Sequence, residues 1–156
     1  MNPTIRWLLC QFIGGALSSR VRRPPEDRVA FTVVGQIISD AFVFNLPVAG
    51  PLGQEAPWFI LDTGAFEMLL PPDLAGRLGL PKLGPLPIGG IGGSVNAYQS
   101  QADILLTSRR FPAVPCVVDP AYRGPGLFGL RFFIDNHLAF TLNPRQQTLN
   151  IRDEGI

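Results

Sequence analysis

Proline and glycine are scattered so densely along this chain that it has no room for a long helix. The 156 residues include 16 prolines and 17 glycines, and a proline inside a helix removes a hydrogen bond and clashes with the preceding turn. Short runs rich in Val, Ile, Phe and Leu lie between these breaks, a pattern typical of strands. The sequence therefore predicts a mostly β protein. We expect strands at residues 29–38, 41–46, 58–62, 68–70, 97–106, 113–118, 138–142 and 148–151.

Two short helices are predicted among these strands. Pro71 and Pro72 open a helical segment that runs to residue 78, and Gly79 follows it. Proline near the first helical position and glycine just past the last one fit the known capping preferences. A second helical turn is expected at residues 131–136. The final two strands flank Pro144 in a turn and read as a hairpin.

The length and composition predict one globular domain. A chain of this length has room for a single domain with a real core, and 46% hydrophobic with 16% charged residues is a globular composition. We expect a domain at residues 29–152, a lead-in at 1–28 and a tail at 153–156. The net charge of +1 offers no footprint for nucleic acid. The arginines at positions 20, 22, 23 and 28 are interpreted as a solvated tail.

The N-terminal segment leaves two interpretations open. Residues 7–17 are largely apolar and follow Arg6, as in a signal peptide, but Gln11 and two glycines interrupt the run and no clean cleavage pattern follows. The run is also too short to span a bilayer. A cleaved signal or membrane tether is the alternative to a lead-in or packing helix. Cys10 and Cys116 do not make a disulfide framework, and Cys116 fits a small buried hydrophobe. A reducing, cytoplasmic location is expected.

The triplet Asp62-Thr63-Gly64 is the candidate for chemistry. Four large apolar residues, 58–61, precede it, so a buried strand would deliver the Asp62 carboxylate to the lip of a cleft. Gly64 permits a tight turn, and the Thr63 hydroxyl can hydrogen-bond sideways and hold that turn. A triplet of this kind arises by chance in roughly 5–10% of chains this long, and most examples are surface turns. The apolar run before it favours a functional carboxylate.

Other catalytic schemes find little support. His137 is the only histidine, in a context where a turn or strand-start role is commoner than catalysis. A Gly-x-Ser-x-Gly nucleophile elbow is absent, and one histidine with two distant cysteines disfavours zinc. The glycine-rich segment 89–93 lacks the Lys-Ser/Thr ending of a phosphate-binding loop. We expect no metal and no cofactor.

Four segments, taken in order, resemble the retropepsin-like aspartic proteases, in particular the bacterial relatives with a single Asp-Thr-Gly per chain. Residues 59–65 resemble the catalytic motif, and 70–80 resemble the strand, helix and turn that follow it. Residues 88–98 resemble the glycine-rich flap hairpin, and 126–133 resemble the segment that crosses beneath the catalytic turn. The resemblance covers about residues 40–152. It implies an all-β, retropepsin-like half-barrel with a flap hairpin and one or two short helices.

The resemblance also implies an activity and its residues. Asp62, Thr63 and Gly64 would form half of a catalytic site, and a homodimer would bring two copies of Asp62 together. The substrate would be an extended peptide or protein. Its lining residues would be Ala65, Phe66, Gly89, Gly90, Ile91, Gly92 and Gly93. A flexible surface loop is the alternative for residues 89–93, and a dimeric peptide- or protein-binding module without catalysis is the alternative function.

The sequence departs from the family pattern at two linked positions. Many retroviral members carry an acidic residue four positions after the start of the triplet and an arginine directly after the later glycine, which form an ion pair. Phe66 and Leu130 occupy those positions here. Glu67 and Arg131 are each displaced by one, which leaves a shifted ion pair open as an alternative. The glycine-rich segment also lacks an aromatic tip, although Tyr98 lies a little beyond it.

Overall fold

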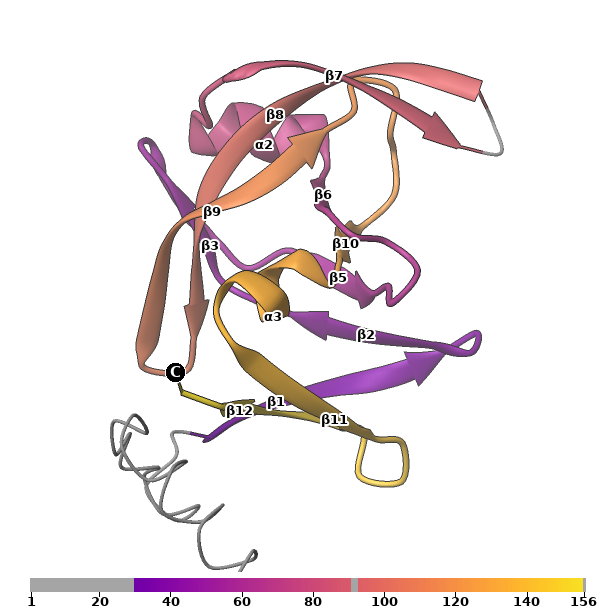
Figure 1. The fold of residues 1–156 in the computed structure, drawn as a ribbon, viewed down its shortest axis with the longest axis vertical. Coiled ribbons are helices and arrows are strands. Elements are labelled where there is room, and N and C mark those ends of the chain that lie inside the picture. The colour runs from indigo at the N-terminus through magenta and orange to yellow at the C-terminus, as the bar shows by residue number, and fades with distance from the viewer. Residues whose placement is uncertain (1–29, 91–92, 156) are drawn as a thin grey trace, which may run out of the picture.

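The strands form one strongly curled sheet, to which two short helices are attached. The computed structural model describes residues 30–90 and 93–155, and Figure 1 shows the sheet curling into a half-barrel. The strand order is β11-β12-β1-β2-β5-β10-β6-β9-β8-β3-β4, with β7 paired to β8 beside this path. The elements are β1 (Ala30–Ile38), β2 (Ala41–Asn45), β3 (Val48–Gly50), β4 (Gly53–Glu55), β5 (Trp58–Leu61), β6 (Met68–Leu70), α2 (Pro72–Leu78), β7 (Gly84–Gly90), β8 (Gly93–Leu106), β9 (Arg109–Val118), β10 (Gly126–Phe128), α3 (Arg131–Asp135), β11 (Leu138–Asn143) and β12 (Thr148–Asp153).

The predicted all-β class and both helices are confirmed. Each predicted strand has a counterpart, although β8 and β9 each begin four residues earlier than expected. Helix α2 ends as predicted, because Gly79 adopts the left-handed conformation at its C-cap with φ +65°. Residue 29, where the first strand was expected to begin, lies outside the described residues, as does the N-terminal lead-in. No helix within 30–90 and 93–155 is long and apolar enough to cross a bilayer.

The β7–β8 hairpin forms although β7 contains two prolines. Pro85 and Pro87 pair with Tyr98 and Asn96 of β8, although a proline cannot donate a hydrogen bond to a neighbouring strand. Residues two apart direct their backbone nitrogens to the same edge of a strand. Since β7 has a single described neighbour, both proline nitrogens fit its unpaired edge. The predicted flap hairpin is therefore present in the described residues, and its tip, Ile91 and Gly92, lies outside them.

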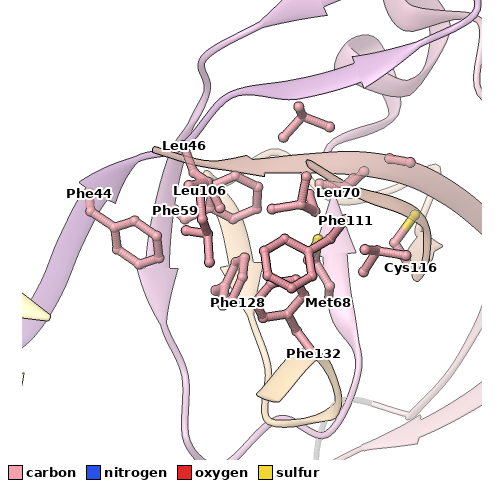
Figure 2. Packing of buried hydrophobic residues seen from close by; sticks show 14 of the residues in the cluster. Phe44, Leu46, Phe59, Met68, Leu70, Leu106, Phe111, Cys116, Phe128 and Phe132 are labelled. Carbon is pink, nitrogen blue, oxygen red and sulfur yellow. The ribbon is translucent and has the colours of Figure 1, made fainter. Parts of the chain in front are cut away.

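The core is built around a cluster of phenylalanine rings. Phe128 of β10 is 1% exposed, and its ring centroid lies 5.6 Å from that of Phe44, 5.5 Å from Phe59 and 5.0 Å from Phe132 (Figure 2). These rings come from β2, β5 and α3. Aromatic pairs in edge-to-face contact stabilise a core beyond the area they bury. Phe128 therefore ties together the elements that surround Asp62.

We predict that Phe128→Ala lowers the free energy of unfolding by about 3 to 5 kcal/mol, because it leaves a cavity among four elements. Val34→Ala is the control, since Val34 is 72% exposed, and it should change stability by about 0.5 kcal/mol or less. Urea denaturation at one fixed protein concentration measures both, as self-association adds to apparent stability. Similar losses in the two variants would contradict this account of the core.

A carboxylate stabilises a bulge in the β8–β9 hairpin. The register of the two strands shifts between Ala102 and Ile104, and Ala113 of β9 adopts a positive φ of 51°. The Asp103 carboxylate accepts a hydrogen bond from the Ala113 N–H at 2.7 Å and another from Arg110 Nε at 2.8 Å. The Ala113 bond, followed by the Arg110 bond, lowers the pKa of Asp103. The ionised carboxylate thus compensates for the strained backbone at Ala113.

We predict that Asp103→Asn destabilises the protein by about 1 to 2 kcal/mol at pH 7, the usual contribution of a hydrogen bond to a charged group. Because the folded-state pKa is lowered, the carboxylate stabilises the fold above its unfolded pKa of about 3.9, and this contribution is lost as the pH falls further. Urea denaturation at pH 7 and pH 3 should therefore show a difference between wild type and variant that shrinks at pH 3. An equal difference at both pH values would contradict this assignment.

Candidate active site

Asp62 lies at the end of β5, in a turn that spans residues 62–67 and is called the Asp62 turn below. Its N–H donates to the carbonyl oxygen of Phe128 at 3.1 Å, and its own carbonyl accepts from the Ala65 N–H at 3.2 Å. The Gly64 N–H donates to Asp62 Oδ1 at 2.9 Å. A Cβ atom at Gly64 would lie 3.3 Å from that oxygen, which is tight. The carboxylate is therefore held in one pose by the backbone that follows it.

The segment 126–131 crosses beside the Asp62 turn and is hydrogen-bonded to it. Strand β10 is parallel to β5, with Phe128 opposite Leu61, and antiparallel to β6. Beyond β10, the N–H groups of Leu130 and Arg131 donate to the carbonyls of Ala65 and Phe66 at 3.0 and 2.8 Å. The backbone of the turn is thus bonded to one crossing segment at both its start and its end.

Two glycines let this segment approach so closely. A Cβ at Gly126 would lie 2.5 Å from the Phe59 ring, and a Cβ at Gly129 would overlap the carbonyl oxygens of Phe66 and Glu67. Neither glycine has a positive φ, so space rather than backbone conformation excludes a side chain here. The predicted crossing beneath the turn depends on these two positions.

An ion pair closes the far side of the turn. Arg131 Nη1 lies 2.8 Å from Glu67 Oε1 and its Nε lies 3.1 Å from Asp135 Oδ2. The bonds to Asp135 and Glu67 raise the pKa of the Arg131 guanidinium, which also lies 6.0 Å from the centre of the Phe66 ring. The shifted ion pair that the sequence left open is therefore present: displacing both partners by one residue preserves their contact.

The predicted site residues fall into two groups. Residues 62–66 lie together in the Asp62 turn, where Asp62 and Ala65 are half-buried, Thr63 and Gly64 are exposed, and Phe66 is 55% exposed. Gly89, Gly90 and Gly93 lie on the β7–β8 hairpin. Figure 1 shows this hairpin projecting on the same side of the molecule as the Asp62 turn. Ile91 and Gly92 lie outside the described residues, so the role of the whole hairpin stays a prediction.

A hollow of about 660 Å³ lies at the base of the β7–β8 hairpin, lined in part by Lys82, Asn96 and Tyr98. Lys82 Nζ lies 5.0 Å from the centre of the Tyr98 ring, within the range of a cation–π contact. Burial is the main cause of the raised pKa of Tyr98, and the charge of Cys116 raises this pKa further. The aromatic residue just beyond the glycine-rich segment therefore belongs to the hairpin base.

The other two residues considered for catalysis, Cys116 and His137, occupy positions that suit a structural role. Cys116 is buried in β9, and burial raises the pKa of its thiol to about 12, so it stays protonated and is a poor nucleophile. His137 lies in the turn before β11 with a φ of 53°, and its N–H donates to the Ile134 carbonyl. Within the described part of the chain, no cluster of three His, Cys, Asp or Glu side chains could hold a metal ion.

Sequence reasoning missed one residue near Asp62. Tyr122 lies in the connection between β9 and β10, and its hydroxyl donates to the Pro125 carbonyl at 2.8 Å. Burial raises the pKa of Tyr122, and the charge of Asp62 raises it further. The signal available in the sequence was two turn-forming pairs, Asp119-Pro120 and Gly124-Pro125, on either side of an aromatic residue.

The comparisons with known proteins agree with this geometry. Residues 48–132 match the family described as aspartyl protease. This is more than half of the chain, which therefore belongs to the aspartyl protease family. No curated protein sequence matches it.

Solved structures extend the likeness to the retropepsin-like fold. The EIAV protease complexed with the inhibitor HBY-793 superposes with a TM-score of 0.53 at 20% identity, over 65% of this chain and 93% of that one. A retropepsin-like aspartic protease from Rickettsia conorii superposes with a TM-score of 0.54 at 14% identity, over 80% of this chain and 93% of that one. The retropepsin-like resemblance is confirmed at the level of fold.

We predict a measurable coupling between Glu67 and Arg131. Their side chains are 31% and 35% exposed, so solvent screening limits the pair to about 1 kcal/mol or less. A double-mutant cycle of Glu67→Gln and Arg131→Gln, measured by urea denaturation, isolates this energy. The matched control is the Glu55–Arg77 pair, whose side chains are 38% and 58% exposed and whose coupling should be smaller. Equal coupling in the two cycles would contradict a specific role for the pair at the Asp62 turn.

Proposed function

We propose that this chain is an aspartic endopeptidase in which Asp62 activates a water molecule to attack a peptide bond. The observation that carries the proposal is the pose of Asp62: a carboxylate at the end of a buried strand, fixed by the Gly64 N–H and anchored to the Phe128 carbonyl. A structural surface turn does not need a second segment bonded beneath it. Membership of the aspartyl protease family supports the same reading.

The active form would be a homodimer. The chain contains one Asp-Thr-Gly triplet, whereas this chemistry requires two carboxyl groups. Thr63 and Gly64 are exposed, so the Asp62 turn is open to a second copy of itself. Strand β11 ends the strand order and has one neighbour among the described strands, which leaves a backbone edge for a partner. A two-fold axis through the turn would bring the two Asp62 side chains together.

Paired carboxyl groups would divide the work between them. Two like charges at such short range do not both ionise, so the pair holds one shared proton. The ionised carboxylate takes a proton from water as the water attacks the scissile carbonyl, and the protonated partner hydrogen-bonds the developing oxyanion. The Gly64 N–H keeps Asp62 oriented throughout. The rate should therefore show a bell-shaped dependence on pH that belongs to the pair.

The substrate would be an extended polypeptide that lies between the Asp62 turn and the β7–β8 hairpin. Backbone hydrogen bonds in such a complex provide affinity, and side-chain pockets provide specificity. Ala65 and the 55% exposed Phe66 would contribute an apolar wall. The glycine-rich residues 89–93 would form the lid that closes over the peptide and excludes water.

We predict that Asp62→Asn reduces peptide cleavage by at least about 10³-fold, because it removes the proton acceptor. Cleavage of an unfolded protein substrate between pH 3 and 7, followed by mass spectrometry of the products, measures this. Asp40→Asn is the matched control: Asp40 is exposed in the β1–β2 turn with a φ of 64°, which asparagine tolerates well, so activity should be unchanged. A wild-type dimer that binds peptides but cleaves none would support the binding-module alternative instead.

A mixing experiment tests the dimer separately. If each site uses Asp62 from both chains, excess Asp62→Asn protein should lower the activity per wild-type chain as subunits exchange. Excess Asp40→Asn protein, which is itself active, should leave the activity per active chain unchanged. Activity per wild-type chain that stays constant as Asp62→Asn protein is added, with exchange shown by labelled subunits, would mean that each chain carries a complete site.

A further inference from the structure

The loop at residues 119–125, between β9 and β10, is held in shape by its own polar groups. Asp119 Oδ1 accepts from the Ala121 N–H at 2.9 Å, and the Asp119 carbonyl accepts from the Tyr122 N–H at 3.1 Å. Arg123 Nη1 donates to the carbonyls of Pro120 and Tyr122 at 2.7 and 2.9 Å. A loop of seven residues with this many internal bonds is a compact wall rather than a simple tether.

Tyr122 closes this wall. Its hydroxyl donates to the Pro125 carbonyl at 2.8 Å. This hydrogen bond links residues three positions apart and stabilises the last turn before β10. A Cβ at Gly124 would overlap that hydroxyl, which shows how closely the loop is packed around the ring. The half-buried Tyr122 ring therefore occupies space that a side chain at position 124 would need.

The same loop is tied to the Asp62 turn. Pro125 leads directly into β10, whose Phe128 carbonyl accepts from the Asp62 N–H at 3.1 Å. Figure 1 shows the loop descending from the end of β9 to β10, between the β7–β8 hairpin and the Asp62 turn. The Asp62 charge is felt at the Tyr122 phenol, whose pKa is raised by burial first and by Asp62 second. A neutral phenol keeps its proton and remains a hydrogen-bond donor.

We propose that Tyr122 is a positioning residue: by donating to Pro125, it locks the loop at residues 119–125 into a preformed wall beside Asp62, against which substrate is held. The inference rests on the proposed peptidase function. A rigid wall lowers the ordering cost of the reactive complex. The hydroxyl acts through the loop and takes no part in the chemical step.

The activity test removes the Tyr122 hydroxyl and compares the result with the loss of a hydroxyl elsewhere in the chain. Tyr122→Phe removes the latch but keeps the ring, and we expect kcat/KM to fall about tenfold, the effect of losing one hydrogen bond, with the midpoint of urea denaturation nearly unchanged. Gly124→Ala displaces the ring by a different route and should give a similar loss. Thr32→Val is the matched control, since it also removes one hydroxyl hydrogen bond, from Thr32 of β1 to Asn150 Oδ1 at 3.0 Å, and should leave kcat/KM unchanged. Unchanged kcat/KM in both loop variants of an active enzyme would overturn the inference.

A second test needs no activity, so it separates this inference from the proposed function. In a Tyr98→Phe background, Tyr122 is the only tyrosine, and its ¹³Cζ resonance needs no further assignment. We expect the pKa of Tyr122 read from this resonance to be lower in the Asp62→Asn variant than with Asp62 present, because the Asp62 charge raises it. Asp119 and Arg123 also lie in the loop, so the Asp62→Asn variant is needed to subtract any contribution from Asp119. A titration identical with and without Asp62 would overturn the inference, whereas a wild-type protein that cleaves nothing but shows the Asp62-dependent shift would overturn only the peptidase proposal.

Discussion

The hydrogen bond from the Asp62 N–H to the Phe128 carbonyl is the contact on which the rest of the site depends. It joins the end of β5 to β10, a three-residue strand whose register is also set by its pairing with β5 and β6. Phe128 itself packs against rings from β2, β5 and α3. Packing in the core therefore sets the position of the Asp62 carboxylate. The two bonds beyond β10 and the Glu67–Arg131 pair then fix the far end of the same turn.

The sequence predicted the parts of this structure that depend on local chemistry. Helix α2 is bounded by residues that cap it wherever they occur, and the strands rich in Val, Ile and Phe carry their own signal. Strands β3, β4, β7 and β10 were not among the strands predicted from composition, because they are short or contain glycine and proline, and pairing with their partners makes them strands. The resemblance implied only the hairpin at 88–98 and the crossing segment at 126–133. The influence of the Asp62 charge on Tyr122 was missed because the two residues are far apart in sequence, and β10 connects the loop of one to the turn of the other.

The contacts that shape the Asp62 turn lie within one chain, whereas the proposed chemistry needs two chains. A single chain folds the Asp62 turn completely, since all the contacts that hold it come from residues 59–67 and 126–135. The exposed Thr63 and Gly64 face outward from this finished scaffold. In the proposed mechanism, the orientation of the Asp62 carboxylate therefore does not depend on protein concentration. The catalytic activity does, because it requires the dimer, whose fraction rises with protein concentration.

The prolines of β7 have a consequence for how the hairpin meets other chains. An exposed strand edge is a template for unwanted pairing, and it recruits a neighbour through alternating donors and acceptors. Pro85 and Pro87 supply only acceptors at two successive positions on that edge, so an approaching strand finds no continuous ladder to join. A hairpin rich in glycine and proposed to open for substrate would otherwise be a starting point for aggregation. The outer edge of β7 is a poor template for another strand, which would limit such pairing even when the hairpin opens.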